Sequence, residues 1–220
     1  MLKRDDLKSL ALVTAMAIAA WAQPSQSDAA DLQTLTVAGG CFWCVESDFE
    51  KVQGVKSAVS GFTGGRVNNP TYKAVTKGGT GHYEAVQITF DADQVSRARL
   101  LDMFFRSVDP TDAGGQFCDR GESYRTAIFV SNAAEKKVAE AAKASAQADL
   151  GQKVVTPILS EGTFYPADAS HQDYYKGTKL VLTRFGPKKQ STAYKLYRKA
   201  CGRDARVREL WGSAAPFAGS

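Results

Sequence analysis

Residues 39–46 read Gly-Gly-Cys-Phe-Trp-Cys-Val-Glu, between a β-like run, Thr34–Ala38, and a run whose apolar residues recur at helical spacing. A strand that leads through two glycines into a helix places Cys41 at or near the first turn of that helix. There the unpaired backbone N–H groups and the helix dipole favour the thiolate, which is the nucleophilic form. Phe42 and Trp43 would wall a small apolar pocket beside this sulfur. The stretch therefore predicts a reactive cysteine; the alternative is a buried structural cysteine in a glycine turn.

Composition favours one globular domain, or two small ones at most. The chain has 220 residues, of which 44% are hydrophobic and 23% charged, and its formal net charge is +5. Apart from Lys188-Lys189 and the stretch 194–208, the basic residues are scattered, whereas nucleic-acid binding needs a concentrated basic face. We therefore expect no nucleic-acid partner, and we expect a monomer.

The N-terminus resembles an export signal. Lys3, Arg4 and Lys8 precede a largely apolar run, and Ala20-Trp21-Ala22 offers a cleavage site of small residues. That run is shorter than the ~20 residues that a membrane span needs. We expect a signal over 1–22, a linker over 23–33, a periplasmic location and no membrane span after cleavage. Later cleavage, or an uncleaved anchor, stays open.

Strand-like and helix-like segments alternate after the linker, which predicts a mixed α/β unit over 34–185. The expected strands cover 34–38, 55–63, 84–90, 125–130 and 154–159, and the expected helices cover 41–52, 96–108 and 132–150. From residue 186 the chain is basic with little apolar periodicity. We expect 186–220 to be a flexible, irregular arm that carries Cys201.

The strand 84–90 gives a second chemical signal. Val86, Ile88 and Phe90 share one face by the two-residue period of a strand, and Glu84 has the same parity. Desolvation on that face would raise the pKa of the Glu84 carboxyl and keep it protonated near neutral pH, as a general acid requires. The alternative is a solvated carboxylate at a frayed strand end.

The chain has four cysteines and two histidines. A chain of this length does not need disulfides to fold, so a thiol–disulfide enzyme is favoured over a disulfide scaffold. We expect His82 and His171 to be packed histidines rather than catalytic bases. No metal site is predicted, because Cys118 and Cys201 lack a second ligand close by in the sequence.

Gly40-Cys41-Phe42-Trp43 resembles the signature of type A peptide methionine sulfoxide reductases. Six further segments match motifs of that family in order: Asn69–Tyr72, Thr80–Glu84, Asp109–Thr111, Asp119–Gly121, Ser123–Arg125 and His171-Gln172. The resemblance covers roughly two-thirds of the chain. It implies an α/β (α+β) two-layer sandwich with a ferredoxin-like core, to which we add the irregular C-terminal arm.

The resemblance also implies roles for individual residues. Cys41 would attack the sulfur of methionine sulfoxide, and Glu84 would protonate the sulfoxide oxygen. Tyr72 and Tyr124 would hydrogen-bond that oxygen, and Asp119 would order the site. The cysteine would then carry a sulfenic acid, and methionine would be released.

Two further sets of residues follow from the resemblance. Phe42 and Trp43 would hold the methyl group of the substrate, so that the site accepts only the S epimer. A second thiol would then condense with the sulfenic acid to give a disulfide. The candidates for this resolving role are, in order, Cys201, Cys44 and Cys118.

The resemblance implies an enzyme without a cofactor. Its substrates would be oxidised proteins or free methionine sulfoxide, and its reductant an external thioredoxin-like dithiol protein. Two alternatives remain from the residues alone. One is an exported thioredoxin-like disulfide oxidoreductase that uses Cys41 and Cys44, and the other is a non-enzymatic metal-binding protein that uses the cysteines and histidines.

Overall fold

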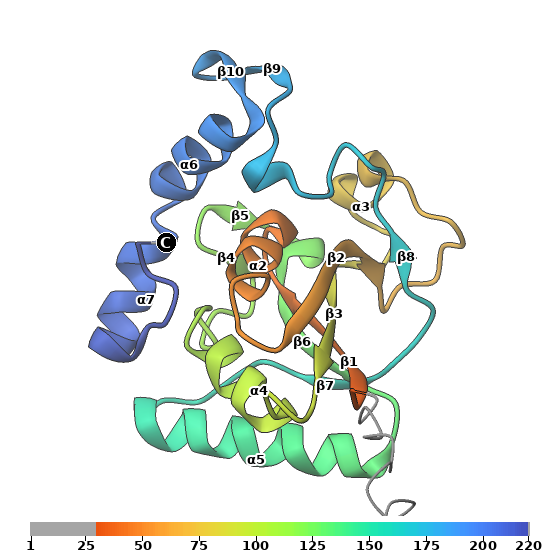
Figure 1. Cartoon of the computed structure of the whole chain (residues 1–220), viewed down its shortest axis with the longest axis vertical. Helices are drawn as coiled ribbons and strands as arrows, with labels where there is room; N and C mark the ends of the chain where they lie inside the picture. The colour runs from red at the N-terminus through yellow and green to blue at the C-terminus, as the bar shows by residue number, and fades with distance from the viewer. Residues whose placement is uncertain (1–29, 220) are drawn as a thin grey trace, which may run out of the picture. The chain divides into compact units, whose positions relative to one another are not determined.

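The computed structural model describes residues 30–219. The predicted signal over 1–22 and most of the predicted linker lie outside these residues. Residues 31–219 belong to one compact unit, whose helices and strands Figure 1 shows. Within the described residues no helix is long and apolar enough to cross a membrane.

The strands and helices alternate along the chain. The strands are β1 (Leu32–Gly39), β2 (Val55–Thr63), β3 (Tyr83–Asp91), β4 (Gly115–Gln116), β5 (Asp119–Arg120), β6 (Thr126–Val130), β7 (Ile158–Ser160), β8 (Tyr165–Pro166), β9 (Leu180–Thr183) and β10 (Gly186–Lys189). The helices are α2 (Phe42–Phe49), α3 (Tyr72–Lys77), α4 (Arg97–Phe105), α5 (Ala133–Leu150), α6 (Gln190–Cys201) and α7 (Arg203–Trp211). Short 3-10 helices are η1 (Glu122–Tyr124), η2 (Tyr174–Lys176) and η3 (Gly212–Ala214).

The central sheet has the strand order β7-β6-β1-β3-β2-β8. Its four inner strands are all antiparallel, and β7 pairs parallel with β6. The order of elements β1-α2-β2-β3-α4-β6 is the β-α-β-β-α-β arrangement of a ferredoxin-like core. The two-layer α/β architecture expected from the sequence is confirmed.

The main core lies between this sheet and the helices. Val86, Ile88 and Phe90 of β3 are fully buried in it together with Phe49 of α2. Helix α2 packs on β2 and β3, and α4 packs on α5 (Figure 1). Because Glu84 has the parity of the three apolar β3 residues, its carboxyl points toward α2.

The ends of two elements follow from local signals in the sequence. The side chain of Asn132 accepts a hydrogen bond from the backbone N–H of Glu135 at 2.9 Å and caps the start of α5. Gly151 ends the same helix in the left-handed conformation, with φ 62°. The strand predicted over 154–159 is shorter and later, because only Ile158–Ser160 pair with β6.

The expectation of an irregular segment from residue 186 is wrong. This segment completes the β9–β10 hairpin and then forms α6 and α7, which run beside the sheet in Figure 1. Val207 and Trp211 of α7 join the main core. The buried Arg198 of α6 pairs with Asp48 of α2 at 2.8 Å. The apolar contacts are few and lie among many lysines and arginines, so the sequence shows little periodicity although the helices are packed.

Candidate active site

A cavity of about 450 Å³ opens beside the N-terminus of α2. All the residues to which the sequence analysis gave a site role line it: Cys41, Phe42, Trp43, Cys44, Tyr72, Glu84, Cys118, Asp119, Tyr124 and Cys201. They come from α2, α3, β3, the loop 117–124 and the end of α6. The structure thus brings all ten residues together around one cavity.

The turn between β1 and α2 sets the position of Cys41. Gly40 has φ +80°, and a Cβ there would lie 2.6 Å from the Cβ of Gln116, so only glycine fits. Cys41 is the N-cap residue of α2, and its carbonyl oxygen accepts the backbone N–H of Cys44 at 3.0 Å. The predicted passage from strand through glycine to helix is confirmed, with the half-buried Cys41 at the helix start.

The thiols of Cys41 and Cys44 share a hydrogen bond, which changes the expected charge of the nucleophile. This bond is the main reason why the pKa of the Cys41 thiol lies well above its ordinary value, with burial and nearby charges adding to the shift. The same bond lowers the pKa of Cys44, and the guanidinium groups of Arg203 and Arg198 lower it further. The pair thus raises the pKa of Cys41 and lowers that of Cys44, whereas the sequence predicted a thiolate on Cys41.

Glu84 is the buried acid of the site. It is 2% exposed, and its Oε2 accepts the backbone N–H of Phe42 at 3.1 Å. Burial raises the pKa of its carboxyl to about 8, against the opposing effect of that hydrogen bond. Its Oε1 has no hydrogen-bond partner among residues 30–219. Glu84 is therefore a neutral acid near pH 7 with one oxygen unused.

Two tyrosines and an aspartate complete the polar wall. The hydroxyls of Tyr72 and Tyr124 share a hydrogen bond, and burial followed by the charge of Glu84 raises the pKa of each hydroxyl. Both remain O–H donors at all ordinary pH values. Burial also raises the pKa of Asp119, while the positive charges of Arg203 and Arg184 oppose the shift.

Aromatic side chains line the cavity together with these polar groups. Phe42 is buried and packs on Phe62, with ring centroids 5.8 Å apart. The rings of Trp43 and Tyr174 are parallel, with centroids 3.8 Å apart and 3° between their planes. Tyr174 is absent from the predicted site, although it follows the His171-Gln172 motif directly. These rings give the cavity an apolar side beside Cys41.

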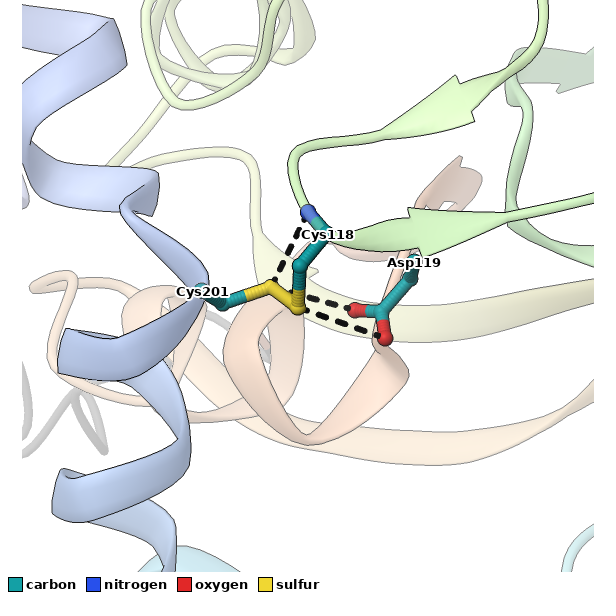
Figure 2. Close-up of side chains that lie close together, drawn as sticks. All are labelled: Cys118, Asp119 and Cys201. Carbon is teal, nitrogen blue, oxygen red and sulfur yellow. Dashed lines mark hydrogen bonds between the residues drawn. A yellow bond between two sulfur atoms is a disulfide. The ribbon is translucent and has the colours of Figure 1, made fainter.

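Cys118 and Cys201 form a disulfide, 83 residues apart in the sequence. Figure 2 shows the bond beside Asp119, whose two carboxylate oxygens lie 3.9 Å from the sulfur of Cys118 and 3.7 Å from that of Cys201. The backbone N–H of Cys118 also points at the Cys201 sulfur, at 3.2 Å. Cys41 and Cys44 are the free thiols of this structure.

Two buried arginines from the C-terminal helices approach Cys44. Arg198 is 5% exposed and donates to the hydroxyl of Tyr194 at 3.0 Å, and Tyr194 packs against Cys44. Arg203 is 2% exposed and donates to the carbonyl oxygen of Gly39 at 3.1 Å. Its Nε and Nη2 have no hydrogen-bond partner in the described part of the chain. A buried cation that lacks an ion pair is costly, so its field favours a nearby anion.

The two histidines have structural positions. His82 is buried, accepts the backbone N–H of Gly65 at 3.1 Å through Nδ1 and contacts the carbonyl oxygen of Val67 at 2.8 Å through Nε2. His171 stacks on Tyr72 with centroids 4.2 Å apart, and burial lowers the pKa of its imidazole. Neither is among the residues that line the cavity.

Two clusters of side chains have the spacing of metal ligands. One is Cys118, Asp119 and Cys201, but its sulfurs are joined in the disulfide. The other is Glu46, Glu50 and Asp173, outside the cavity. There the Glu46 carboxylate accepts the hydroxyl of Ser60 and the backbone N–H of Asp173, and Glu50 accepts the ammonium group of Lys176 at 2.8 Å. These carboxylates are engaged in holding η2 against α2.

Residues 33–212 match the sequence model of a family described as peptide methionine sulfoxide reductase. The peptide methionine sulfoxide reductase MsrA 2 of Rhizobium meliloti is 47% identical over 187 residues, which cover 85% of this chain and 87% of the relative. The MsrA 2 of Caulobacter vibrioides is 46% identical over 181 residues, covering 82% of this chain and 86% of the relative.

Solved structures are also similar. Mxr1 from Saccharomyces cerevisiae in reduced form has a TM-score of 0.63 at 29% identity, with 66% of this chain and 84% of that chain covered. Methionine sulfoxide reductase A of Corynebacterium diphtheriae has a TM-score of 0.60 at 29% identity, with 70% of this chain and 76% of that chain covered. The similarity in sequence and the similarity in fold thus point to the same group of proteins.

Proposed function

Because the chain belongs to the peptide methionine sulfoxide reductase family, we propose that this cavity reduces the S epimer of methionine sulfoxide, in proteins and free, to methionine. One observation carries the proposal. A neutral, buried carboxyl with an unused oxygen, Glu84, lines the same cavity as the thiol pair of Cys41 and Cys44. A sulfoxide oxygen leaves sulfur only once it is protonated, and Glu84 holds the proton at the pH of the reaction.

The substrate is oriented by the two walls. Its methyl group lies against Phe42 and Trp43, and its oxygen faces Glu84, Tyr72 and Tyr124. A fixed methyl slot, fixed oxygen donors and a fixed nucleophile accept one configuration at sulfur. The apolar rings exclude water from the methyl group, which has no polar contact to lose.

Cys44 acts as the base for Cys41. The thiolate of Cys44 accepts the Cys41 proton along the hydrogen bond that joins them, and Cys41 becomes the thiolate. The Cys41 sulfur then attacks the sulfoxide sulfur while Glu84 protonates the oxygen. The S–O bond of the substrate breaks, methionine leaves, and the oxygen ends on Cys41 as a sulfenic acid.

Cys44 is also the resolving thiol. Its sulfur bonds to the Cys41 sulfur, and the hydroxyl of the sulfenic acid leaves as water. The result is a Cys41–Cys44 disulfide. Cys201 ranked first among the candidates from sequence, but in this structure it is bound to Cys118, whereas Cys44 is free and already contacts Cys41. A dithiol protein of the thioredoxin kind then reduces the new disulfide to two thiols by exchange.

Export is a separate proposal, supported by the sequence of residues 1–22. We propose a periplasmic enzyme whose signal is cleaved after Ala22. Fractionation of expressing cells followed by N-terminal sequencing tests it. A full-length N-terminus in the cytoplasmic fraction would contradict both the location and the cleavage.

The reaction is tested with separated epimers. The protein is incubated with N-acetyl-methionine S-sulfoxide or R-sulfoxide amide and dithiothreitol, and methionine release is measured. We expect turnover with the S epimer alone. The thiol pair also suits a disulfide oxidoreductase, so reduction of a protein disulfide together with inactivity on both epimers would replace the proposal with that function.

A further inference from the structure

The β9–β10 hairpin exposes an apolar face to solvent. Strand register places Leu182 opposite Pro187 and Leu180 opposite Lys189, and residues two apart on a strand share a face. Leu180 is 67% exposed and Leu182 is 85% exposed. In the part of the chain that the structure describes, they are two of only four large hydrophobic residues with such exposure, so this face is an unusual feature of the surface.

This face is continuous with the mouth of the catalytic cavity. Leu182, Thr183 and Arg184 line the cavity together with Cys41. The opposite face of the hairpin is anchored, because Val181 packs against the cluster of Tyr174 and Tyr194. Figure 1 shows the hairpin next to the start of α6, away from the six-stranded sheet. Its outer face therefore extends the rim of the cavity outward.

The hairpin carries positive charge that no ion pair within the described residues compensates. The hairpin and its first flanking residue carry Lys179, Arg184, Lys188 and Lys189. None of these four makes an ion pair with a carboxylate of residues 30–219. Lys189 is paired with Leu180 and shares its face, whereas Lys188 is paired with Val181 on the opposite face. An apolar strip with Lys189 on it complements a polypeptide that offers apolar and acidic side chains.

We propose that the outer face of β9 and β10 binds the polypeptide on either side of an oxidised methionine, and that it selects extended segments rich in apolar and acidic residues. The inference rests on the proposed reduction of methionine sulfoxide. A sulfoxide side chain that enters the cavity leaves its backbone at the mouth, so the neighbouring residues of a protein substrate run across the rim. Free methionine sulfoxide ends at the mouth and does not reach Leu180.

The test compares a small and a peptide substrate in wild type, Leu180→Ser and Lys189→Glu. Neither Leu180 nor Lys189 lines the cavity. The probes are N-acetyl-methionine S-sulfoxide amide and two short peptides with a central methionine S-sulfoxide, flanked by Leu and Glu or by Ser and Lys. Dithiothreitol is the donor throughout. Leu32→Ser is the matched control, because Leu32 is 57% exposed and does not line the cavity.

We expect wild type to prefer the Leu/Glu peptide. Leu180→Ser should lower kcat/KM for that peptide by about fivefold, since a leucine contact contributes on the order of 1 kcal/mol. Lys189→Glu should lower it for the Leu/Glu peptide and raise it for the Ser/Lys peptide. Turnover of the blocked amino acid should stay unchanged in both variants, and Leu32→Ser should match wild type on every substrate.

Four results would overturn the proposal. The first is that both variants keep the wild-type kcat/KM for both peptides. The second is that kcat/KM for the blocked amino acid falls as much as kcat/KM for the peptides. If kcat/KM of the variants fell only when a protein dithiol replaced dithiothreitol as donor, the hairpin would bind the reductant and not the substrate. If wild type sedimented as a dimer and Leu180→Ser as a monomer, the outer face of the hairpin would bind a second copy of the chain. Inactivity of wild type on the blocked S-sulfoxide would instead refute the reaction itself.

Discussion

The carboxyl of Glu84 accepts the backbone N–H of Phe42 at 3.1 Å through one oxygen and leaves the other without a partner in residues 30–219. The bond links the acid on β3 to the first residue of α2, directly after Cys41. The position of the Glu84 carboxyl relative to Cys41 is therefore held by this backbone contact. The unused oxygen is the one that can donate its proton to a substrate.

Glu84→Gln should slow the chemical step while leaving substrate binding intact, because the amide fills the same space but has no acidic proton. We expect the single-turnover rate of methionine release to fall by about 10²–10⁴. Rapid-quench kinetics measure this rate. In wild type the rate should also fall as pH rises through about 8, where Glu84 loses its proton. An unchanged rate in Glu84→Gln would exclude Glu84 as the acid.

The same variant should be more stable than wild type at alkaline pH. The folded-state pKa of Glu84 is about 8, above the ordinary 4.5, so the folded state binds the proton more tightly. The stability from this group is complete below about pH 4.5 and is lost as pH rises through about 8. Glu84→Gln should therefore raise the free energy of unfolding at about pH 9 by on the order of a few kcal/mol. Urea unfolding of both proteins at acid and at alkaline pH measures this change. If the two proteins differed by the same free energy of unfolding at both pH values, the titration of Glu84 would be contradicted.

Cys44→Ser should stop the cycle after one turnover, because the sulfenic acid on Cys41 loses its neighbouring thiol. We expect at most one equivalent of methionine per protein when a protein dithiol is the donor. Mass spectrometry of wild type after one turnover should show a Cys41–Cys44 disulfide. The double variant Cys118→Ser/Cys201→Ser is the control and should still form it. A Cys41–Cys201 or Cys41–Cys118 link in wild type would reject Cys44 as the resolving thiol.

Arg203→Met should raise the pKa of Cys44, because a buried cation that favours its thiolate is removed. In a Cys41→Ser background Cys44 is the one free thiol, so its rate of alkylation by iodoacetamide against pH reports that pKa. Arg203→Lys should restore most of the rate, since it keeps the charge. Arg208→Met, on the exposed side of α7, should leave the profile unchanged. A profile that responds to none of these changes would remove Arg203 from the chemistry of Cys44.

Removal of the Cys118–Cys201 disulfide should destabilise the protein without preventing the first turnover. The bond closes a loop with a sequence separation of 83 residues, for which loop entropy gives about 4.5 kcal/mol. Unfolding of Cys118→Ser/Cys201→Ser in denaturant measures the loss. A double variant as stable as wild type would show that α6 and the loop 117–119 stay together without the covalent bond.

Local sequence patterns were sufficient to predict where the residues at the centre of the cavity lie. The strand–glycine–helix order places Cys41 at the N-cap of α2, and strand parity places Glu84 on the same face as Val86. Both follow from contacts close in the sequence. The effect of Arg198 and Arg203 on the pKa of Cys44 was not predictable in this way, because these arginines lie more than a hundred residues later and add to the local effect of Cys41.

The C-terminal segment shows most clearly which structure the sequence pattern does not predict. Its sequence is basic and only weakly periodic, yet α6 and α7 bury Arg198, Arg203 and Trp211 against the body of the unit. A buried arginine resembles a surface arginine in a sequence, since partners that make its burial favourable, such as Asp48 for Arg198, lie far away in the chain.

The sequence by itself therefore predicted the strand–glycine–helix turn at Cys41 and the buried strand face at Glu84, because residue types and spacing act through neighbouring turns and strands, and its resemblance to a known family predicted the ferredoxin-like core. Tertiary structure alone decided that Cys118 pairs with Cys201 and that the β9–β10 hairpin borders the cavity. These relationships join segments distant along the chain, and folding in three dimensions brings them together without any periodic signal in the residues that connect them.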